Sequence, residues 1–196
     1  MSITVTIIII IVTCVVSVLA FVGKIPSDRL VFNAWAVSNR REYWRFFTHA
    51  LLHGGWGHLL INMFVLYSFG WIVEGDFGLR FGAKGSLYYA LFYVAAAAVS
   101  SVWDYFEHRD DYSYNALGAS GAVNAVLFAS IVSNPMSKLI VFPIPIPLPA
   151  WLFAILYLGY SVYMSKRGGD NIGHRAHVSG AVFGAAVALL MKYLTF

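Results

Sequence analysis

The chain has 196 residues, of which 60% are hydrophobic and only 11% are charged. A soluble domain averages about 25% charged residues, so the composition excludes an ordinary soluble domain and predicts an integral membrane protein. The formal net charge of +4 is scattered without a basic block, which argues against nucleic acid as a partner. The one cysteine, Cys14, cannot form an intramolecular disulfide.

Six segments are apolar enough to be membrane-spanning helices, each of which needs about 20 residues to cross the hydrocarbon. They are residues 3–22, 56–73, 85–103, 117–132, 150–164 and 172–193. The predicted fold class is therefore an all-α membrane protein, with one domain of six transmembrane helices over residues 1–196. The fourth and fifth segments are short, which predicts tilt or local thinning of the bilayer.

The first segment, residues 3–22, has two interpretations. A secretory signal peptide also has an apolar core, but that core is usually about 7–15 residues long and follows a basic region. Here the apolar run is longer, and no basic residue precedes it. We therefore favour a retained span over a cleaved signal peptide.

The connections between the segments differ in character. Residues 23–55 form a long loop, rich in Trp, Phe, Arg and His, that is apolar enough to lie in the membrane interface. Residues 104–116 are polar and predict an aqueous loop. The proline-rich run 143–149 cannot be the interior of a helix and predicts an extended lead-in to the fifth span. The glycine-rich residues 165–175 predict a mobile cap loop before the last span.

Polar side chains inside the apolar segments are costly there and mark functional candidates. In the second segment, His58 and Asn62 are four residues apart, so they share one face of a helix. In the fourth segment, Ser120 stands between Gly118 and Gly121. A serine in such a position is commonly a small residue at a close helix contact, so its chemistry depends on what lies opposite.

The sixth segment carries a histidine on the same helical face as two glycines: His177 with Gly180 and Gly184. Small residues let helices approach closely, so this face predicts a neighbour such as the fourth segment. A histidine within about 2.6–3.2 Å of a serine hydroxyl takes its proton and activates it as a nucleophile. With no Asp or Glu inside a span near His177, the pattern predicts a dyad with Ser120 rather than a triad.

Attack by a serine places negative charge on the substrate carbonyl oxygen, and this charge needs fixed donors. His58 and Asn62 supply two side-chain donors, and the Ser120 amide supplies a third at the start of a helix. Each residue also has a simpler explanation, because intramembrane histidines and asparagines often only bridge helices. Their occurrence together is what favours a catalytic site.

Four motifs together resemble the rhomboid intramembrane serine proteases, from about residue 40 to the end of the chain. They are YWRFFTHALLHGGWGHLLINMF (43–64), GWIVEG (70–75), GASG (118–121) and AHVSGAVFG (176–184). The resemblance, to the minimal six-span bacterial form, implies an endopeptidase that cleaves transmembrane segments of other membrane proteins and uses no cofactor and no metal. It leaves the oligomeric state, the source and the natural substrate open.

The resemblance also implies a topology. The chain would be a multi-pass protein of the cell (inner) membrane, with both termini cytoplasmic and the site open to the extracytoplasmic side. The fifth span and the loop after it would act as gate and cap. The distribution of Lys and Arg instead favours a cytoplasmic first loop, and the resemblance overrules this distribution.

By the same resemblance, Ser120 is the nucleophile, His177 is the general base, and His58, Asn62 and the Ser120 amide form the oxyanion hole. The residues implied to pack helices closely near the site are Gly118, Gly121, Gly180 and Gly184. The resemblance implies structural roles for Trp44 and Arg45 in the first loop and for Glu74 at the end of the second span.

The sequence departs from the family pattern at two positions. Many bacterial members have a tyrosine four residues after the serine, which stacks on the catalytic histidine, and here that position is Asn124. Either Asn124 or another group must then orient His177. Two residues before the histidine, where a small residue is usual, stands Arg175, which would narrow the mouth of the site.

Two other functions remain open from the sequence. A catalytically inactive rhomboid-like protein that binds membrane clients usually lacks the serine or the histidine, whereas this chain has both. A small metal or haem carrier would use His49, His53 and His58. The segment HALLH, however, lacks the glutamate of the zinc-protease pattern HExxH, so we do not expect a metal site.

Overall fold

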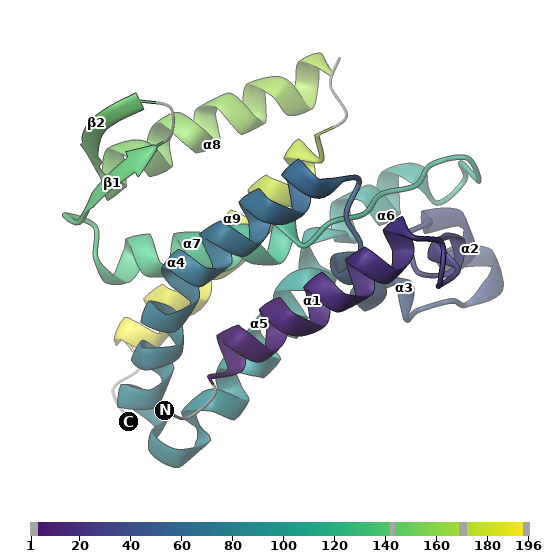
Figure 1. Cartoon of the computed structure of the whole chain (residues 1–196). Helices are drawn as coiled ribbons and strands as arrows, with labels where there is room; N and C mark the ends of the chain where they lie inside the picture. Colours follow the sequence, from purple (N-terminus) through teal and green to yellow (C-terminus); the bar gives the residue numbers. More distant parts are fainter. Residues whose placement is uncertain (1–3, 142–143, 169–171, 194–196) are drawn as a thin grey trace.

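The computed structural model describes residues 4–141, 144–168 and 172–193 and is mostly helical (Figure 1). Within these ranges, six long helices overlap the six apolar segments. They are α1 (Val5–Phe21), α4 (Trp56–Phe81), α5 (Gly85–Ser100), α7 (Ser120–Ser133), α8 (Ala150–Arg167) and α9 (His174–Tyr193).

Length and composition alone identify two helical stretches of the described chain that could cross a membrane. One is Trp56–His108, which contains α4, α5 and the short helix α6 (Val102–His108), and the other is α9. Helices α1 and α7 are apolar but shorter. A count of six spans therefore remains a prediction from the sequence pattern.

Helix α4 continues past the predicted end of the second segment at residue 73 and reaches Phe81. It ends at Gly82, whose φ of 56° suits a residue without a Cβ. Gly78 lies inside this helix and has a packing role. A Cβ on Gly85, where α5 begins, would lie 2.5 Å from the Gly78 Cα, so the two glycines let the chain turn back closely.

Two of the predicted loops contain regular structure. The strands β1 (Lys138–Val141) and β2 (Ile144–Pro149) pair in an antiparallel hairpin, so the fold is not purely α-helical. The extended conformation of β2 is as predicted, although residue 143 lies outside the described part. Helix α6 occupies the start of the loop predicted to be aqueous, where Asp104 is only 4% exposed and Tyr105 packs on Phe46 of the first loop.

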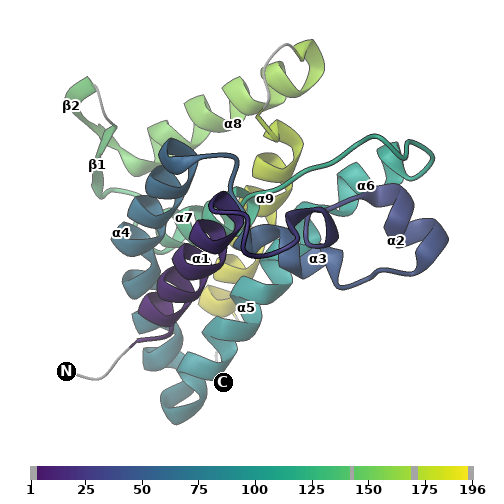
Figure 2. The same ribbon diagram turned by 45° about the vertical axis from the view of Figure 1, so that its right-hand side comes forward.

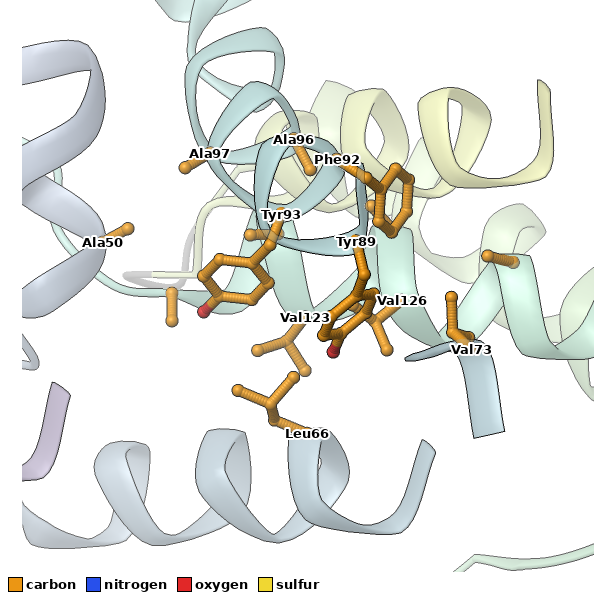
Figure 3. Packing of buried hydrophobic residues seen from close by; sticks show 14 of the residues in the cluster. Ala50, Leu66, Val73, Tyr89, Phe92, Tyr93, Ala96, Ala97, Val123 and Val126 are labelled. Atoms are coloured by element: carbon orange, nitrogen blue, oxygen red, sulfur yellow. The ribbon is translucent and has the colours of Figure 1, made fainter. Parts of the chain in front are cut away.

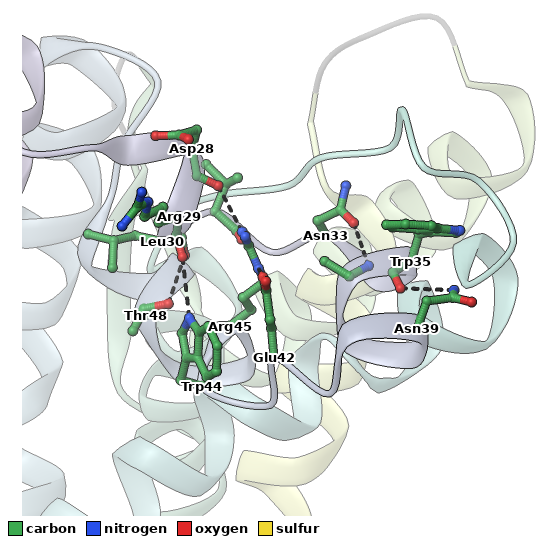
Figure 4. A network of polar contacts seen from close by, with 12 residues as sticks. Asp28, Arg29, Leu30, Asn33, Trp35, Asn39, Glu42, Trp44, Arg45 and Thr48 are labelled. Atoms are coloured by element: carbon green, nitrogen blue, oxygen red, sulfur yellow. Dashed lines mark hydrogen bonds and ion pairs between the residues drawn. The ribbon is translucent and has the colours of Figure 1, made fainter.

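The first loop folds into short helices: η1 (Ser27–Arg29), α2 (Ala34–Arg40), α3 (Arg45–Thr48) and η2 (His49–Leu51). Figure 4 shows how Arg45 holds them together. Its Nη1 donates to the carbonyls of Asp28 at 2.8 Å and Val31 at 2.7 Å, and its Nε pairs with the Glu42 carboxylate. A guanidinium supplies several donors in one rigid plane, which suits this buried position.

Further bonds close the loop. The half-exposed Trp44 donates from its indole to the Arg29 carbonyl at 3.3 Å, and Thr48 donates to the Leu30 carbonyl at 2.8 Å (Figure 4). Trp44 and Arg45 thus both donate to backbone carbonyls of the first loop.

Glu74 of α4 caps the start of α1. Its carboxylate accepts from the amides of Val5 at 2.8 Å and Thr6 at 2.9 Å, and from the Thr6 hydroxyl at 2.8 Å. A negative charge at a helix N-terminus satisfies unpaired amides and complements the helix dipole. This side chain therefore fixes the register of α1 against α4.

The core lies where α4, α5 and α7 meet, as Figure 3 shows. Its large buried side chains come mainly from one face of α5 and pack against shorter ones from α4 and α7. The central members are Leu66, Val73, Tyr89, Phe92, Tyr93, Ala96, Val123 and Val126. These aromatic rings fill the space between α4, α5 and α7.

Helices α7 and α9 touch through their backbones. A Cβ on Gly180 would overlap the carbonyl of Gly121, and a Cβ on Gly184 would overlap the carbonyl of Ala125. On the other side of Gly121, a Cβ would overlap the Ser100 side chain of α5. Three helices therefore meet at the first turn of α7.

Figures 1 and 2 place α8 and the hairpin along one side of the bundle, and α2, α3 and α6 on another. The first turn of α1 and the last turn of α9 lie toward the same end in both views. Among its described residues, α8 fully buries only Ala150 and Ser161. Helix α8 thus has fewer buried residues than any other of the six long helices.

Replacing Gly184 by valine should separate α7 from α9, because its side chain has no space beside Ala125. We expect a loss of stability of about 1–3 kcal/mol or more, measured as a lower midpoint of thermal unfolding in detergent. The matched control is Gly75→Ala on the exposed face of α4, where a Cβ meets nothing within 4 Å. This variant should unfold at or slightly above the wild-type temperature. A wild-type midpoint for Gly184→Val would refute the close contact.

Candidate active site

Ser120 is the first residue of α7 and is partly exposed. Its amide belongs to the first turn, where N–H groups have no partner within the helix. The turn before it is held by the first loop: the Gly118 amide donates to the His49 carbonyl at 3.0 Å, and Phe32 and Ala116 exchange two backbone bonds. Gly118 has a φ of 128°, a conformation that favours glycine.

The ring of His58 packs directly on this turn. A Cβ on Gly118 would lie 2.7 Å from His58 Cε1 and 3.1 Å from His58 Nε2. The Gly54 amide donates to His58 Nδ1 in a long bond of 3.5 Å. With Nδ1 as the acceptor, the proton of the neutral ring is assigned to Nε2, next to the backbone that leads to Ser120.

Asn62 is buried one turn further along the same face of α4. Its Nδ2 donates to the His58 carbonyl at 2.9 Å. A side-chain amide has two N–H groups, so one is used inside the helix and a second remains. The Asn62 side chain is therefore held on the helical turn of α4 that carries His58.

His177 lies in the first turn of α9 and is partly buried. The preceding carbonyl, that of Ala176, lies 3.4 Å from where a Cβ on Gly121 would stand. The residues next to His177 and next to Ser120 are thus in contact, and the Gly121–Gly180 contact continues this packing along α9.

The His177 ring meets a tyrosine from α8. Its Nδ1 is 3.2 Å from the Tyr157 hydroxyl, and the two rings are within 21° of parallel with centroids 6.4 Å apart. Asn124, at the position where a tyrosine was expected, donates instead within its own helix to the Ser120 carbonyl at 2.8 Å. Tyr157 therefore makes the contact that the sequence had considered for Asn124.

Tyr157 is the site residue that sequence reasoning missed. A signal was present, since Phe153, Tyr157 and Ser161 recur every four residues on one face of the fifth segment. The same segment also contains Tyr160 and Tyr163, which the structure leaves exposed. The spacing alone did not decide which tyrosine turns inward.

Arg175 forms an ion pair with Glu107 of α6, with Nη1 and Oε2 2.6 Å apart. The guanidinium is therefore directed toward α6, where it ties the start of α9 to the region of the first loop. The structure thus gives Arg175 a partner that the sequence did not indicate.

The histidines of the first loop are bonded to serines. His49 Nε2 lies 2.9 Å from the Ser101 hydroxyl, and His53 Nδ1 lies 2.9 Å from the Ser17 hydroxyl of α1. Burial lowers the pKa of each ring to about 4, and for His53 the neighbouring His58 adds to this effect. Both rings are neutral at pH 7. Within the described residues, no three His, Cys, Asp or Glu side chains group as a metal site would require.

Comparison with known proteins agrees with the motifs. A family model of the Rhomboid domain matches residues 40–194. The chain belongs to the rhomboid family. This confirms the family predicted from the sequence, and it makes the chain a member of a family of integral membrane proteins.

Several characterised relatives are similar over most of this chain. RHOMBOID-like protein 12, mitochondrial, of Arabidopsis thaliana is 34% identical over 146 residues, which are 70% of this chain and 43% of that protein. Rhomboid protease GlpG of Haemophilus influenzae is 27% identical over 73% of this chain and 67% of its own length. Rhomboid protease GluP of Bacillus subtilis is 31% identical over 77% of this chain and 27% of its own length. The chain thus spans less than half the length of two of these three relatives and about two thirds of the other.

The buried His49 makes stability depend on pH. Its pKa is about 4 in the folded chain and 6.5 when exposed, so between these values the unfolded state binds the proton that the folded state rejects. The contribution of the neutral His49 ring to the free energy of unfolding is therefore fully present above pH 6.5. As the pH drops to 4, the free energy of unfolding decreases by up to about 3 kcal/mol. Thermal midpoints in detergent between pH 7.5 and 4 measure this loss.

The control is His49→Gln, which keeps a donor and an acceptor near Ser101 but does not titrate. Its midpoint should fall less steeply with acid than that of the wild type. His53 titrates in the same interval, so the double variant with His53→Gln should be flatter still. Parallel curves for all three proteins would contradict the assignment.

Proposed function

We propose that this chain is an intramembrane serine endopeptidase that cleaves transmembrane segments of other membrane proteins. The observation that carries the proposal is the glycine contact between α7 and α9, because Gly121 follows Ser120 and Gly180 lies one turn after His177. Membership of the rhomboid family and the protease names of relatives such as GlpG and GluP support it.

In the proposed mechanism, the Ser120 hydroxyl attacks the scissile carbonyl while His177 Nε2 takes its proton. The resulting oxyanion accepts hydrogen bonds from His58 Nε2, the second N–H of Asn62 and the Ser120 amide. His177 then gives its proton to the leaving amine, and an acyl group remains on Ser120. Water, deprotonated by His177, releases that acyl group and restores the serine.

The proposal includes the topology predicted from the sequence. One membrane domain of six spans would lie in the cell (inner) membrane, with cytoplasmic termini and a site open to the opposite side. The six apolar helices support it, as does the position of the first turn of α1 and the last turn of α9 toward one end of the bundle (Figure 2). Helix α8 buries few residues, which suits its proposed role as a gate. Part of the proposed cap, residues 165–175, lies outside the described residues.

Ser120→Ala and His177→Ala should each lower cleavage of a transmembrane model substrate by about 10³-fold or more, because each removes one half of the dyad. The assay uses purified protein in detergent, with the cut site mapped by mass spectrometry. Ser133→Ala, an exposed serine at the end of the same helix α7, is the matched control and should cleave as the wild type does.

Wild-type cleavage by either dyad variant would show that the dyad is wrong. A wild type that binds the substrate but never cleaves it would instead support the alternative, an inactive rhomboid-like protein that binds membrane clients.

Asn62→Ala should lower kcat by about 10²-fold, as expected for the loss of one oxyanion donor. The variant also removes a bond from a side-chain amide to its own helix. Asn39→Ala removes the same kind of bond, from Asn39 Nδ2 to the Trp35 carbonyl at 3.0 Å in α2, away from the site. The control should retain full kcat, and an unchanged kcat for Asn62→Ala would exclude Asn62 from the oxyanion hole.

A further inference from the structure

Tyr157 joins His177 to two buried oxygen atoms. Its hydroxyl lies 3.2 Å from His177 Nδ1 on one side and beside the Asn124 and Ser161 side chains on the other. Among the described residues, Asn124 Oδ1 and Ser161 Oγ are buried atoms that meet no partner in good hydrogen-bond geometry. Buried polar atoms of this kind are costly, so a nearby hydroxyl is the natural donor for them.

The groups involved suggest which atom donates and which accepts at each of these contacts. Asn124 donates from Nδ2 to the Ser120 carbonyl, while its Oδ1, which can only accept, is the buried atom left without a partner. When the Tyr157 hydroxyl donates its one proton to Oδ1 or to Ser161, its oxygen is left to accept. Its contact with His177 is then a hydrogen bond only when Nδ1 carries the proton and donates it.

We propose that Tyr157 is a positioning residue that holds the proton of His177 on Nδ1 and so keeps Nε2 free to act as the base. This inference rests on the proposed function. A neutral imidazole has one N–H and one acceptor nitrogen, and only the tautomer with a bare Nε2 takes a proton at that atom. A base held in the wrong tautomer loses catalysis even when its geometry is intact.

The tyrosine ring is fixed firmly enough for this role. Phe128 of α7 packs on it with centroids 5.9 Å apart, and Phe153 of α8 stacks on it at 5.5 Å and 25°. The near-parallel ring of His177 completes the arrangement. Tyr157 therefore sets both the direction of the histidine ring and the location of its proton.

The competing explanation is that Tyr157 only fills space between α7, α8 and α9. Tyr157→Phe separates the two explanations, because phenylalanine keeps the ring and removes the hydroxyl alone. The matched control is Tyr163→Phe, the same change at an exposed position two turns along α8.

Three readouts are compared for wild type and both variants: kcat and KM on a transmembrane substrate, the thermal midpoint, and the ¹⁵N resonances of the His177 ring. These resonances are assigned by their loss in His177→Ala and report the tautomer. For Tyr157→Phe we expect a fall in kcat of about tenfold, from one lost hydrogen bond. KM and the midpoint should be unchanged, and the share of the Nδ1–H tautomer should decrease.

An unchanged kcat, a fall in kcat matched by a lower midpoint, an equal fall for Tyr163→Phe, or an unaltered tautomer would each overturn the inference. The tautomer readout does not require activity. If the wild type fails to cleave, the proposed function fails, while the ¹⁵N resonances still decide whether Tyr157 holds the proton on Nδ1.

Discussion

The backbone contact between α7 and α9 is the constraint on which the rest of the structure depends. Gly180 and Gly184 lie against the carbonyls of Gly121 and Ala125, and a single added methyl group has no place at either glycine. This closeness brings the first turns of both helices together and leaves α5 to pack against the remaining side of Gly121. The first loop then completes the site, because the His49 carbonyl holds the Gly118 amide just ahead of Ser120.

Two buried charged side chains, Arg45 and Glu74, have structural roles and take no part in the proposed catalysis. Arg45 and Glu74 bind backbone atoms that no helix or strand satisfies: carbonyls of the first loop in one case, and amides at the start of α1 in the other. Arg45 thus fixes the path of the first loop, and Glu74 fixes the start of α1. The buried polar groups of this protein therefore divide between those that hold the scaffold and those near Ser120 and His177.

The sequence was sufficient for those features that depend on local pattern. Apolar runs located the long helices, and the polar residues within them pointed to His58, whose ring packs on Gly118, two residues before Ser120. It was insufficient where tertiary contact decides. The second segment was predicted to end at residue 73, yet α4 continues to Phe81, and within this extension Gly78 packs closely on Gly85. Three tyrosines of α8 were indistinguishable until packing turned Tyr157 inward.

Placing the proposed base on α9 also affects how the protein is made. Ser120 leaves the ribosome first, and His177 follows about 60 residues later, several seconds at the usual rate of synthesis. Until α9 packs on α7, the serine has neither its base nor its closest neighbour, and the oxyanion donors face an incomplete helix bundle. If the chain has the proposed protease activity, that activity is absent during insertion and appears in the same folding step that docks α9.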